Sequence, residues 1–232
     1  MPVKEVNLPD IGKVKIYKRR GTRHIRLSLH PENYVRVTMP TWLPYRTAID
    51  FVRSKAILIS QNRQPRRLLS HNMKIGKNHQ LTFAPTVQAN RATSKIIESK
   101  IVIKYPATSN ITSFEVQKTA LRACLKVLKN EAELTLRPRI NQLAARHGYA
   151  HRNIRLRYLK SRWGSCSSMG DITLNTMLLT LPWNMVDHVI VHELLHTKFM
   201  SHGPDFWSEF EKAEPGAKKR QKLLKQYQPH FH

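Results

Sequence analysis

Apolar and charged residues alternate strictly in three early segments of the chain. Residues 12–17 (GKVKIY), 25–29 (IRLSL) and 34–39 (YVRVTM) each place an apolar side chain at every second position. Successive side chains of a strand point to opposite faces, so this pattern predicts strands with one buried face and one basic, solvent-facing face. The turn-forming residues 31–33 (PEN) separate the last two segments, and we therefore expect a hairpin there.

A helical pattern follows these strands and leads into a second β-rich stretch. Between positions 45 and 62, apolar residues recur at mostly helical spacing, and Pro65 follows, which predicts one helix of several turns. Short apolar runs predict further strands near 72–75, 80–83 and 95–105. Pro106 then opens a run of small and polar residues that is the best candidate for a boundary. We therefore expect a β-rich region with one helix over residues 1–110.

The second half of the chain has helical spacing over much of its length. Apolar residues from 114 to 136 form one stripe, Pro138 predicts a kink, and Gly148 ends the run. The other expected elements are strands at 154–159 and 171–175, a helix after Pro182, and a closing helix at 205–227 interrupted near Pro215. The predicted fold class is α+β, with the β-rich N-terminal half followed by a second domain over residues 111–232.

Composition narrows the class of protein. The chain of 232 residues is 41% apolar and 8% aromatic, which is typical of a folded globular protein. Its two cysteines, Cys124 and Cys166, are far apart, so no disulfide framework is predicted and a reducing compartment fits best. The first residues do not resemble a signal peptide, and no apolar run is long enough to span a bilayer. We therefore expect a cytoplasmic protein that makes no membrane contact.

The net charge of +25 is the unusual feature of the composition. Residues 1–110 contain 21 basic and 5 acidic residues, and residues 111–232 contain 19 and 10. Such an excess favours contact with polyanions, so nucleic acid, nucleotides and acidic proteins are candidate partners. A basic surface without any partner explains the charge equally well.

The strongest chemical signal is the sequence HELLH at residues 192–196. Two histidines four residues apart lie on one face of a helix, so both imidazoles can reach one metal ion, and Glu193 points to the same place. In a chain with 12 His, about 0.03 such matches are expected by chance. The motif therefore predicts a hydrolase in which His192 and His196 bind one zinc ion and Glu193 is the catalytic base.

His202 is the expected third zinc ligand. A catalytic zinc ion typically takes three protein ligands and leaves one position for water. His202 follows His196 by six residues, and Gly203 and Pro204 end the helix and let the chain turn back toward the metal. The sequence thus predicts a site with three histidines.

Three segments together resemble the YgjP-like metallopeptidase family, which is related to the WLM and SprT groups of zincins. They are residues 161–167 (SRWGSCS), residues 171–175 (DITLN), and residues 191–207, which hold the HExxH motif, the third histidine and Phe206-Trp207. The resemblance is strongest over about 155–210, and the hairpin at 28–40 is also similar. It implies a gluzincin-like C-terminal domain in which a small sheet lies over two helices, with His192, His196 and His202 as ligands.

Three functions remain open at this point. The first is a metallopeptidase that acts on a peptide or protein. The second is pyrophosphohydrolysis of nucleoside triphosphates such as UTP, with which some relatives have been credited. The basic N-terminal half could bind such a substrate. The third is a nucleic-acid-associated protein whose zinc domain acts on bound proteins, although Tyr17, Tyr34 and Trp42 are too sparse to predict a base-stacking platform.

Residues outside the metal site complete the predictions. Arg162 is a candidate clamp for an anion or oxyanion, and Trp163 a candidate wall of the cleft; a core position for Trp163 and a supporting role for Arg162 are equally compatible with the sequence. Ser165 and Cys166 lack a His–acid partner arrangement, so a turn or core role is expected. By analogy with zincins, the strand at 171–175 is expected to pair with an extended peptide as an edge strand.

Overall fold

The computed structural model describes residues 3–30, 34–62, 68–229 and 231, and it divides into two compact units, Met1–Arg67 and Leu68–His232. Each unit has its own hydrophobic core. The boundary expected at residue 110 falls inside the second unit, because the strands before it share a core with the long helix after it. The two units are described separately below.

The first unit contains a four-stranded mixed sheet with the order β1-β2-β4-β3. Its strands are β1 (Val3–Leu8), β2 (Gly12–Arg19), β3 (Arg26–Leu29) and β4 (Val35–Pro40). Both hairpins are antiparallel, and β2 pairs with β4 in parallel. The pairing of β3 with β4 confirms the predicted hairpin, whose turn lies outside the described residues. The alternation in the sequence did not predict β1.

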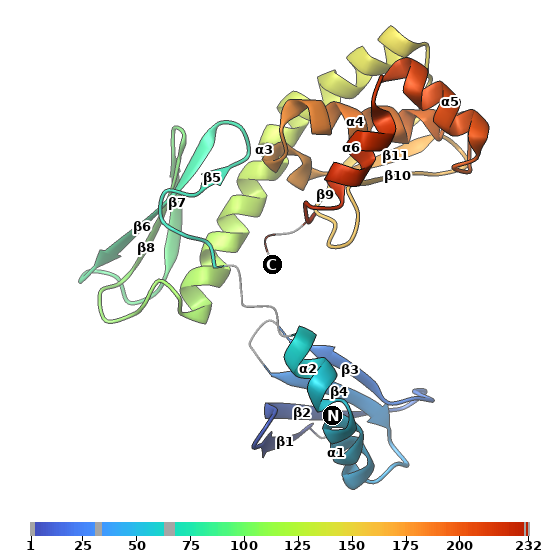
Figure 1. Cartoon of the computed structure of the whole chain (residues 1–232). Helices are drawn as coiled ribbons and strands as arrows, with labels where there is room; N and C mark the ends of the chain where they lie inside the picture. The colour runs from blue at the N-terminus through green and yellow to red at the C-terminus, as the bar shows by residue number, and fades with distance from the viewer. Residues whose placement is uncertain (1–2, 31–33, 63–67, 230, 232) are drawn as a thin grey trace. The chain divides into compact units, whose positions relative to one another are not determined.

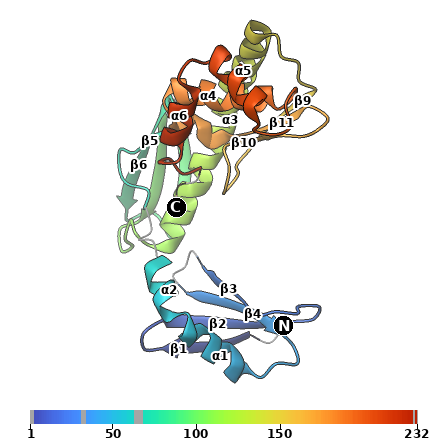
Figure 2. The same cartoon turned by 45° about the vertical axis from the view of Figure 1, so that its right-hand side comes forward.

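Two short helices, α1 (Tyr45–Ser54) and α2 (Ala56–Asn62), cover one face of this sheet (Figures 1 and 2). The single helix predicted for this segment was wrong, because the backbone leaves helical geometry at Lys55, whose N–H bonds back to Val52. The break lets Ile59 reach the same core as Val52. The opposite face of the sheet is not covered by either helix.

The second unit begins with a sheet of the same design, in the order β5-β6-β8-β7. Its strands are β5 (Lys74–Ile75), β6 (His79–Thr86), β7 (Thr93–Ile97) and β8 (Lys100–Pro106). As in the first sheet, the two hairpins are antiparallel and the second strand pairs with the fourth in parallel. A 34-residue helix, α3 (Phe114–His147), packs its buried stripe against this sheet. Pro138 lies inside α3, and Gly148 ends it with a left-handed conformation.

The remaining elements form a third layer on α3 (Figure 1). They are β9 (Asn153–Arg157), β10 (Gly164–Cys166), β11 (Asp171–Asn175), the 3₁₀ helix η1 (Thr176–Thr180), α4 (Trp183–Leu195), α5 (Pro204–Ala213) and α6 (Ala217–Leu224). The break between α5 and α6 confirms the predicted interruption. The strand order is β10-β11-β9, so the prediction of β11 as an edge strand was wrong: it is the central strand, with Ile172 and Leu174 fully buried.

The fold is therefore mixed α+β, with small mixed sheets and several helices. Within the described part of the chain, no helix combines the length and the apolar character needed to cross a bilayer.

Candidate metal centre

Helix α4 positions the first two histidines of the HExxH motif. Pro182 precedes its first turn, and most of its side chains are buried, which is expected of an apolar helix inside a larger core. Asp187 forms a two-pronged ion pair with Arg139 of α3, at 2.7 and 2.5 Å. This pair fixes the position of α4 along α3. His192 and Glu193 lie in the last turns, and His196 caps the C-terminus.

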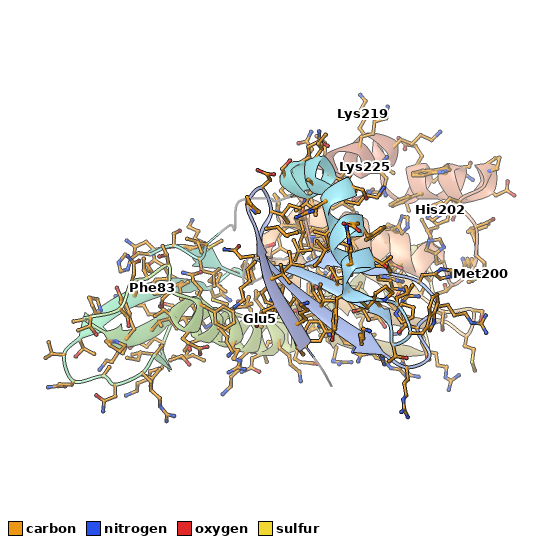
Figure 3. All side chains as sticks on the ribbon, turned by 90° about the horizontal axis from the view of Figure 1, so that it is seen from below. Glu5, Phe83, Met200, His202, Lys219 and Lys225 are labelled. Carbon is orange, nitrogen blue, oxygen red and sulfur yellow. The ribbon has the colours of Figure 1, made fainter. Side chains whose placement is uncertain are left out.

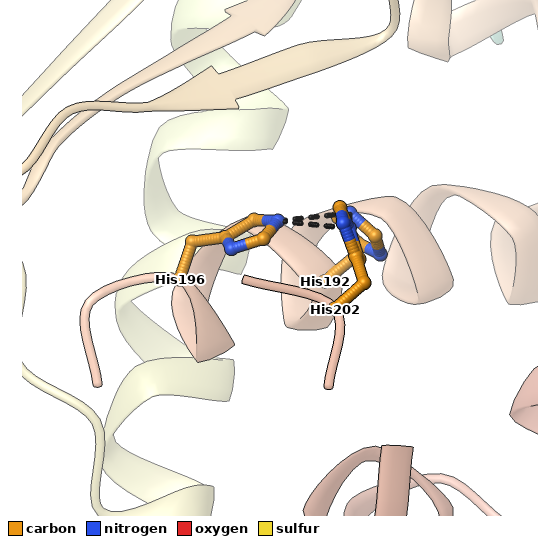
Figure 4. A group of neighbouring side chains, drawn as sticks. All are labelled: His192, His196 and His202. Carbon is orange, nitrogen blue, oxygen red and sulfur yellow. Dashed lines mark hydrogen bonds between the residues drawn. The ribbon is translucent and has the colours of Figure 1, made fainter. Parts of the chain in front are cut away.

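The three predicted ligands converge on one point (Figure 4). Their Nε2 atoms form a triangle with sides of 3.2 Å (His192–His196), 3.2 Å (His196–His202) and 3.1 Å (His192–His202). Three nitrogens bound to one tetrahedral zinc ion at about 2.0–2.1 Å would be about 3.3 Å apart. Three imidazole nitrogens cannot all satisfy one another by hydrogen bonds, because each ring nitrogen either donates or accepts. The donor set therefore fits one zinc ion.

Surrounding groups orient the imidazoles. Nδ1 of His196 lies 2.8 Å from the carbonyl oxygen of Phe199, and it must be the donor because a carbonyl can only accept. The Nε2 atom of His196 then keeps its lone pair for a metal. Phe206 of α5 lies under the triangle, with its ring 4.9 Å from that of His196, 5.2 Å from that of His192 and 4.8 Å from that of His202.

Burial favours the neutral form of two of these histidines, His192 and His202. Desolvation, with a contribution from the neighbouring imidazoles, lowers the pKa of His192 to about 3. Burial also lowers the pKa of His202 from its usual value, and His196 adds to this effect. Neutral imidazoles are the form that binds metal, so protons compete weakly at neutral pH.

Glu193 follows His192 on α4 and is almost completely buried. Burial raises the pKa of its carboxyl to about 8, and the positive charge of Arg162 opposes this shift. Gly164 of β10 lies directly against it: a Cβ atom at Gly164 would be 2.7 Å from Oε1 of Glu193. Gly164 belongs to the segment SRWGSCS, but this contact was not predicted from the sequence. A glycine at the start of a strand, next to predicted cleft residues, was the available signal.

Arg162 and Trp163 lie in the loop that leads into β10. Arg162 is exposed, whereas Trp163 is partly buried against the core. Asn175, which the sequence analysis missed, holds this loop: its side-chain amide donates to the carbonyls of Leu159 at 2.7 Å and Arg162 at 2.9 Å. An asparagine that ends a predicted strand is the sequence signal that could have found it, and the structure shows that it is fully buried and hydrogen-bonded.

One further prediction concerns Ser165 and Cys166, for which a turn or core role was expected. Ser165 and Cys166 form β10 itself, and Cys166 is partly buried against the core. A fourth histidine, His188, lies one turn before His192 but points elsewhere: it bonds Glu214 at 2.6 Å and Gln221 at 3.0 Å. His188 thus joins α4 to α5 and α6 and lies outside the triangle.

Two comparisons with known proteins found a match. A family model for the YgjP-like metallopeptidase domain matches residues 23–227. The chain is also similar to the crystal structure of the metallopeptidase zymogen of Pyrococcus abyssi abylysin, with 30% identity over 38% of this chain and 90% of that one, and a TM-score of 0.34. No curated protein matches the chain. Because the family model covers most of the sequence, the chain belongs to the YgjP-like metallopeptidase family.

Proposed function

We propose that the protein is a zinc-dependent peptide hydrolase with a gluzincin-like arrangement of α4 against β9–β11. The triangle of Nε2 atoms with sides of 3.1 to 3.2 Å carries this proposal. Zinc is the metal that suits three imidazoles in a tetrahedral arrangement with one open position. His192, His196 and His202 would hold a single ion.

Glu193 would be the base that moves protons during hydrolysis. A zinc ion in the site supplies Lewis acidity and lowers the pKa of water. Glu193 accepts a proton from the attacking water and returns it to the leaving amine. Burial strengthens Glu193 as a base, and contact with Gly164 restricts where its carboxylate can lie.

Arg162 and Trp163 would contact the substrate. The charge of Arg162 acts on Glu193, and its exposed guanidinium is placed to stabilise negative charge that develops on the substrate. Trp163 would form a wall of the cleft. Among the described residues β10 pairs only with β11, so the open edge of β10, rather than β11, is where an extended peptide would add as a strand.

The nucleoside triphosphate alternative has weaker support. Magnesium, which usually accompanies phosphate substrates, prefers carboxylate and other oxygen ligands. In the part of the chain that the structure describes, the group suited to a metal consists of three histidines and no carboxylate. A cytoplasmic location stays a proposal, supported by Cys124 and Cys166, which are both free.

The metal is tested by elemental analysis of protein purified without chelator or histidine tag. We expect about one zinc per chain in the wild type and in the control His24→Ala, and a large loss in His192→Ala and His202→Ala. Zinc that persists in both variants would contradict the ligand assignment.

The base is tested by hydrolysis of a peptide library, with a nucleotide library as the second substrate set. Glu193→Gln should keep its zinc and lose roughly 10²- to 10⁴-fold in rate. A wild-type rate in Glu193→Gln would remove this role, and turnover of nucleotides alone would replace the peptidase assignment.

A further inference from the structure

The uncovered face of the first sheet is basic and partly aromatic. Here the outer face of the first sheet means the side chains that point away from α1 and α2. Val14 and Ile16 of β2 are buried in the core, so the alternate positions of that strand point outward. The register of the pairs extends this face to the neighbouring strands. Its cations and central ring are Lys13, Lys15, Tyr17, Arg19, Arg26 and Arg36.

Two cations of this face lie close enough to repel each other. Lys15 and Arg36 are cross-strand neighbours on β2 and β4, and like charges at such positions are destabilising. Glu5 compensates in part, since it pairs with Lys13 at 2.8 Å and Lys15 at 3.0 Å. Figure 3 shows Glu5 on its strand at this sheet. The described part of the chain places no carboxylate within ion-pair distance of Arg36 or Arg26. The face therefore keeps an excess of positive charge that suits a polyanion.

Two cations of this face lie over aromatic rings, of which that of Tyr34 is buried. The guanidinium carbon of Arg36 lies 4.6 Å from the ring centre of Tyr17, and Nζ of Lys15 lies 4.7 Å from that of Tyr34. The ring of Tyr34 is itself stacked on His30 at 4.2 Å. Planar guanidinium and phenol groups are surfaces on which nucleobases stack, while the same cations bind phosphates. Tyr17 and Arg36 together offer both contacts.

The second sheet provides an internal reference. Its strands have the same order, and the face that points away from α3 carries Lys74, Lys95, Lys100 and Lys104. This outer face of the second sheet is as basic as the first, but it contains lysine and threonine where the first has arginine and tyrosine. Both sheets therefore have a basic outer face. The combination of arginine with an aromatic ring is specific to the first sheet.

We propose that the outer face of the first sheet binds single-stranded nucleic acid. Four strands about 4.8 Å apart make a face about 14 Å wide, which exceeds the major groove of about 12 Å. A single strand, in contrast, can lie flat on a sheet, with its phosphates on the cations and a base on Tyr17. Part of this face lies on β2, before residue 23, where the family match begins. The proposal does not depend on the proposed hydrolase activity.

The test measures fluorescence anisotropy of a labelled single-stranded oligonucleotide of about 20 nucleotides with the full-length protein. Arg26→Gln/Arg36→Gln removes two charges from the outer face of the first sheet, and Lys95→Gln/Lys104→Gln removes two from that of the second. Near physiological salt, we expect Kd to rise at least about tenfold in the first double variant and less than about twofold in the second. Equal losses would overturn the proposal in favour of unspecific charge.

Stacking is tested separately with Tyr17→Leu, which keeps the charge. Its Kd should rise several-fold while the slope of log Kd against log salt stays as in the wild type, because no phosphate contact is removed. Unchanged affinity in Tyr17→Leu, tighter binding of a duplex of the same sequence, or equal affinity for poly-glutamate would each overturn the proposal. Circular dichroism checks that the variants fold. Glu193→Gln should bind like the wild type, so failure of either proposal is seen independently of the other.

Discussion

The two four-stranded sheets share their strand order but lie on cores of different chemistry. Every buried polar or charged side chain among the described residues belongs to the second unit. They are Gln117, Glu131, Asn175, Thr176, His188 and Glu193. The first unit is held by apolar contacts between neighbouring elements. Since buried polar groups are costly unless they have partners, they mark the places where position matters more than stability.

Two of these side chains, Glu131 and Gln117, hold segments that are distant in sequence. Glu131 of α3 accepts from the N–H of Lys77 at 2.7 Å and lies 3.3 Å from His79. Gln117 bonds both the N–H and the carbonyl of Leu69. The ammonium group of Lys77 then reaches the carbonyl of Leu181, just before α4. The second sheet is thus connected through polar bonds to the segment just before α4, the helix that bears His192.

The largest expected effect comes from removing such a bond. In Glu131→Ala the N–H of Lys77 loses its partner and a buried space opens, so we expect a loss of about 3–4 kcal/mol in unfolding free energy. Tryptophan fluorescence in a Trp42→Phe background reports the second unit alone, because the other tryptophans lie there. Glu5→Ala, which breaks only exposed ion pairs of the first sheet, should leave the unfolding midpoint of the first unit unchanged. Equal losses of unfolding free energy in Glu131→Ala and Glu5→Ala would contradict the difference between the two units.

A matched pair of glycines sharpens the contrast further. Gly76 and Gly21 both have positive φ, at +66° and +75°. An added Cβ at Gly76 would overlap the Glu131 carboxylate, whereas at Gly21 it would meet nothing within 4 Å. We expect Gly76→Ala to lower the unfolding free energy by about 2–3 kcal/mol. Gly21→Ala should lower it by about 1 kcal/mol, which is the effect of backbone strain alone. Urea unfolding measures the first, and hydrogen exchange in the first unit measures the second. Similar losses of unfolding free energy in the two variants would show that Glu131 of α3 moves aside for the added Cβ atom at Gly76.

A third expected effect is a pH dependence of the second unit, in which Glu193 lies. In zinc-free protein, burial raises the pKa of Glu193 to about 8, from 4.5 in the unfolded chain. The resulting stabilisation is complete below pH 4.5 and is lost as pH rises through 8. Between pH 6.5 and 8.5 the unfolding free energy should fall by about 2 kcal/mol, and this fall should be absent in Glu193→Gln. A fall of the same size in Glu193→Gln would assign it to another group.

Local patterns in the sequence predicted the elements better than their assembly. Alternation located β2 and β4, and helical spacing located α3 and α4, because each signal depends on neighbouring residues. The sequence did not predict that the two sheets have the same strand order. Their buried side chains occupy corresponding positions, but the residue types differ. The pairing of β9 with β11 in parallel, which makes β11 central, depends on partners elsewhere in the chain.

The metal site was predictable to a similar depth. The HExxH motif predicts two candidate ligands by helix geometry alone, and the structure brings His202 close to both of them. The contact of Gly164 with Glu193 and the bonds of Asn175 join residues far apart in sequence, so periodicity carries no trace of them. The roles of Arg162 and Trp163 remain predictions.

The bonds of Asn175 have a consequence for the order of events during synthesis. Domains near the N-terminus generally fold first as a chain emerges, and every contact in the core of the first unit involves residues before 60. The loop that carries Arg162 is different, because the amide of Asn175 that holds it also donates to the carbonyl of Pro229 at 3.2 Å. That partner lies 54 residues after Asn175 in the chain. A nascent chain would thus leave the loop of Arg162 without all of its bonds until Pro229 has left the ribosome.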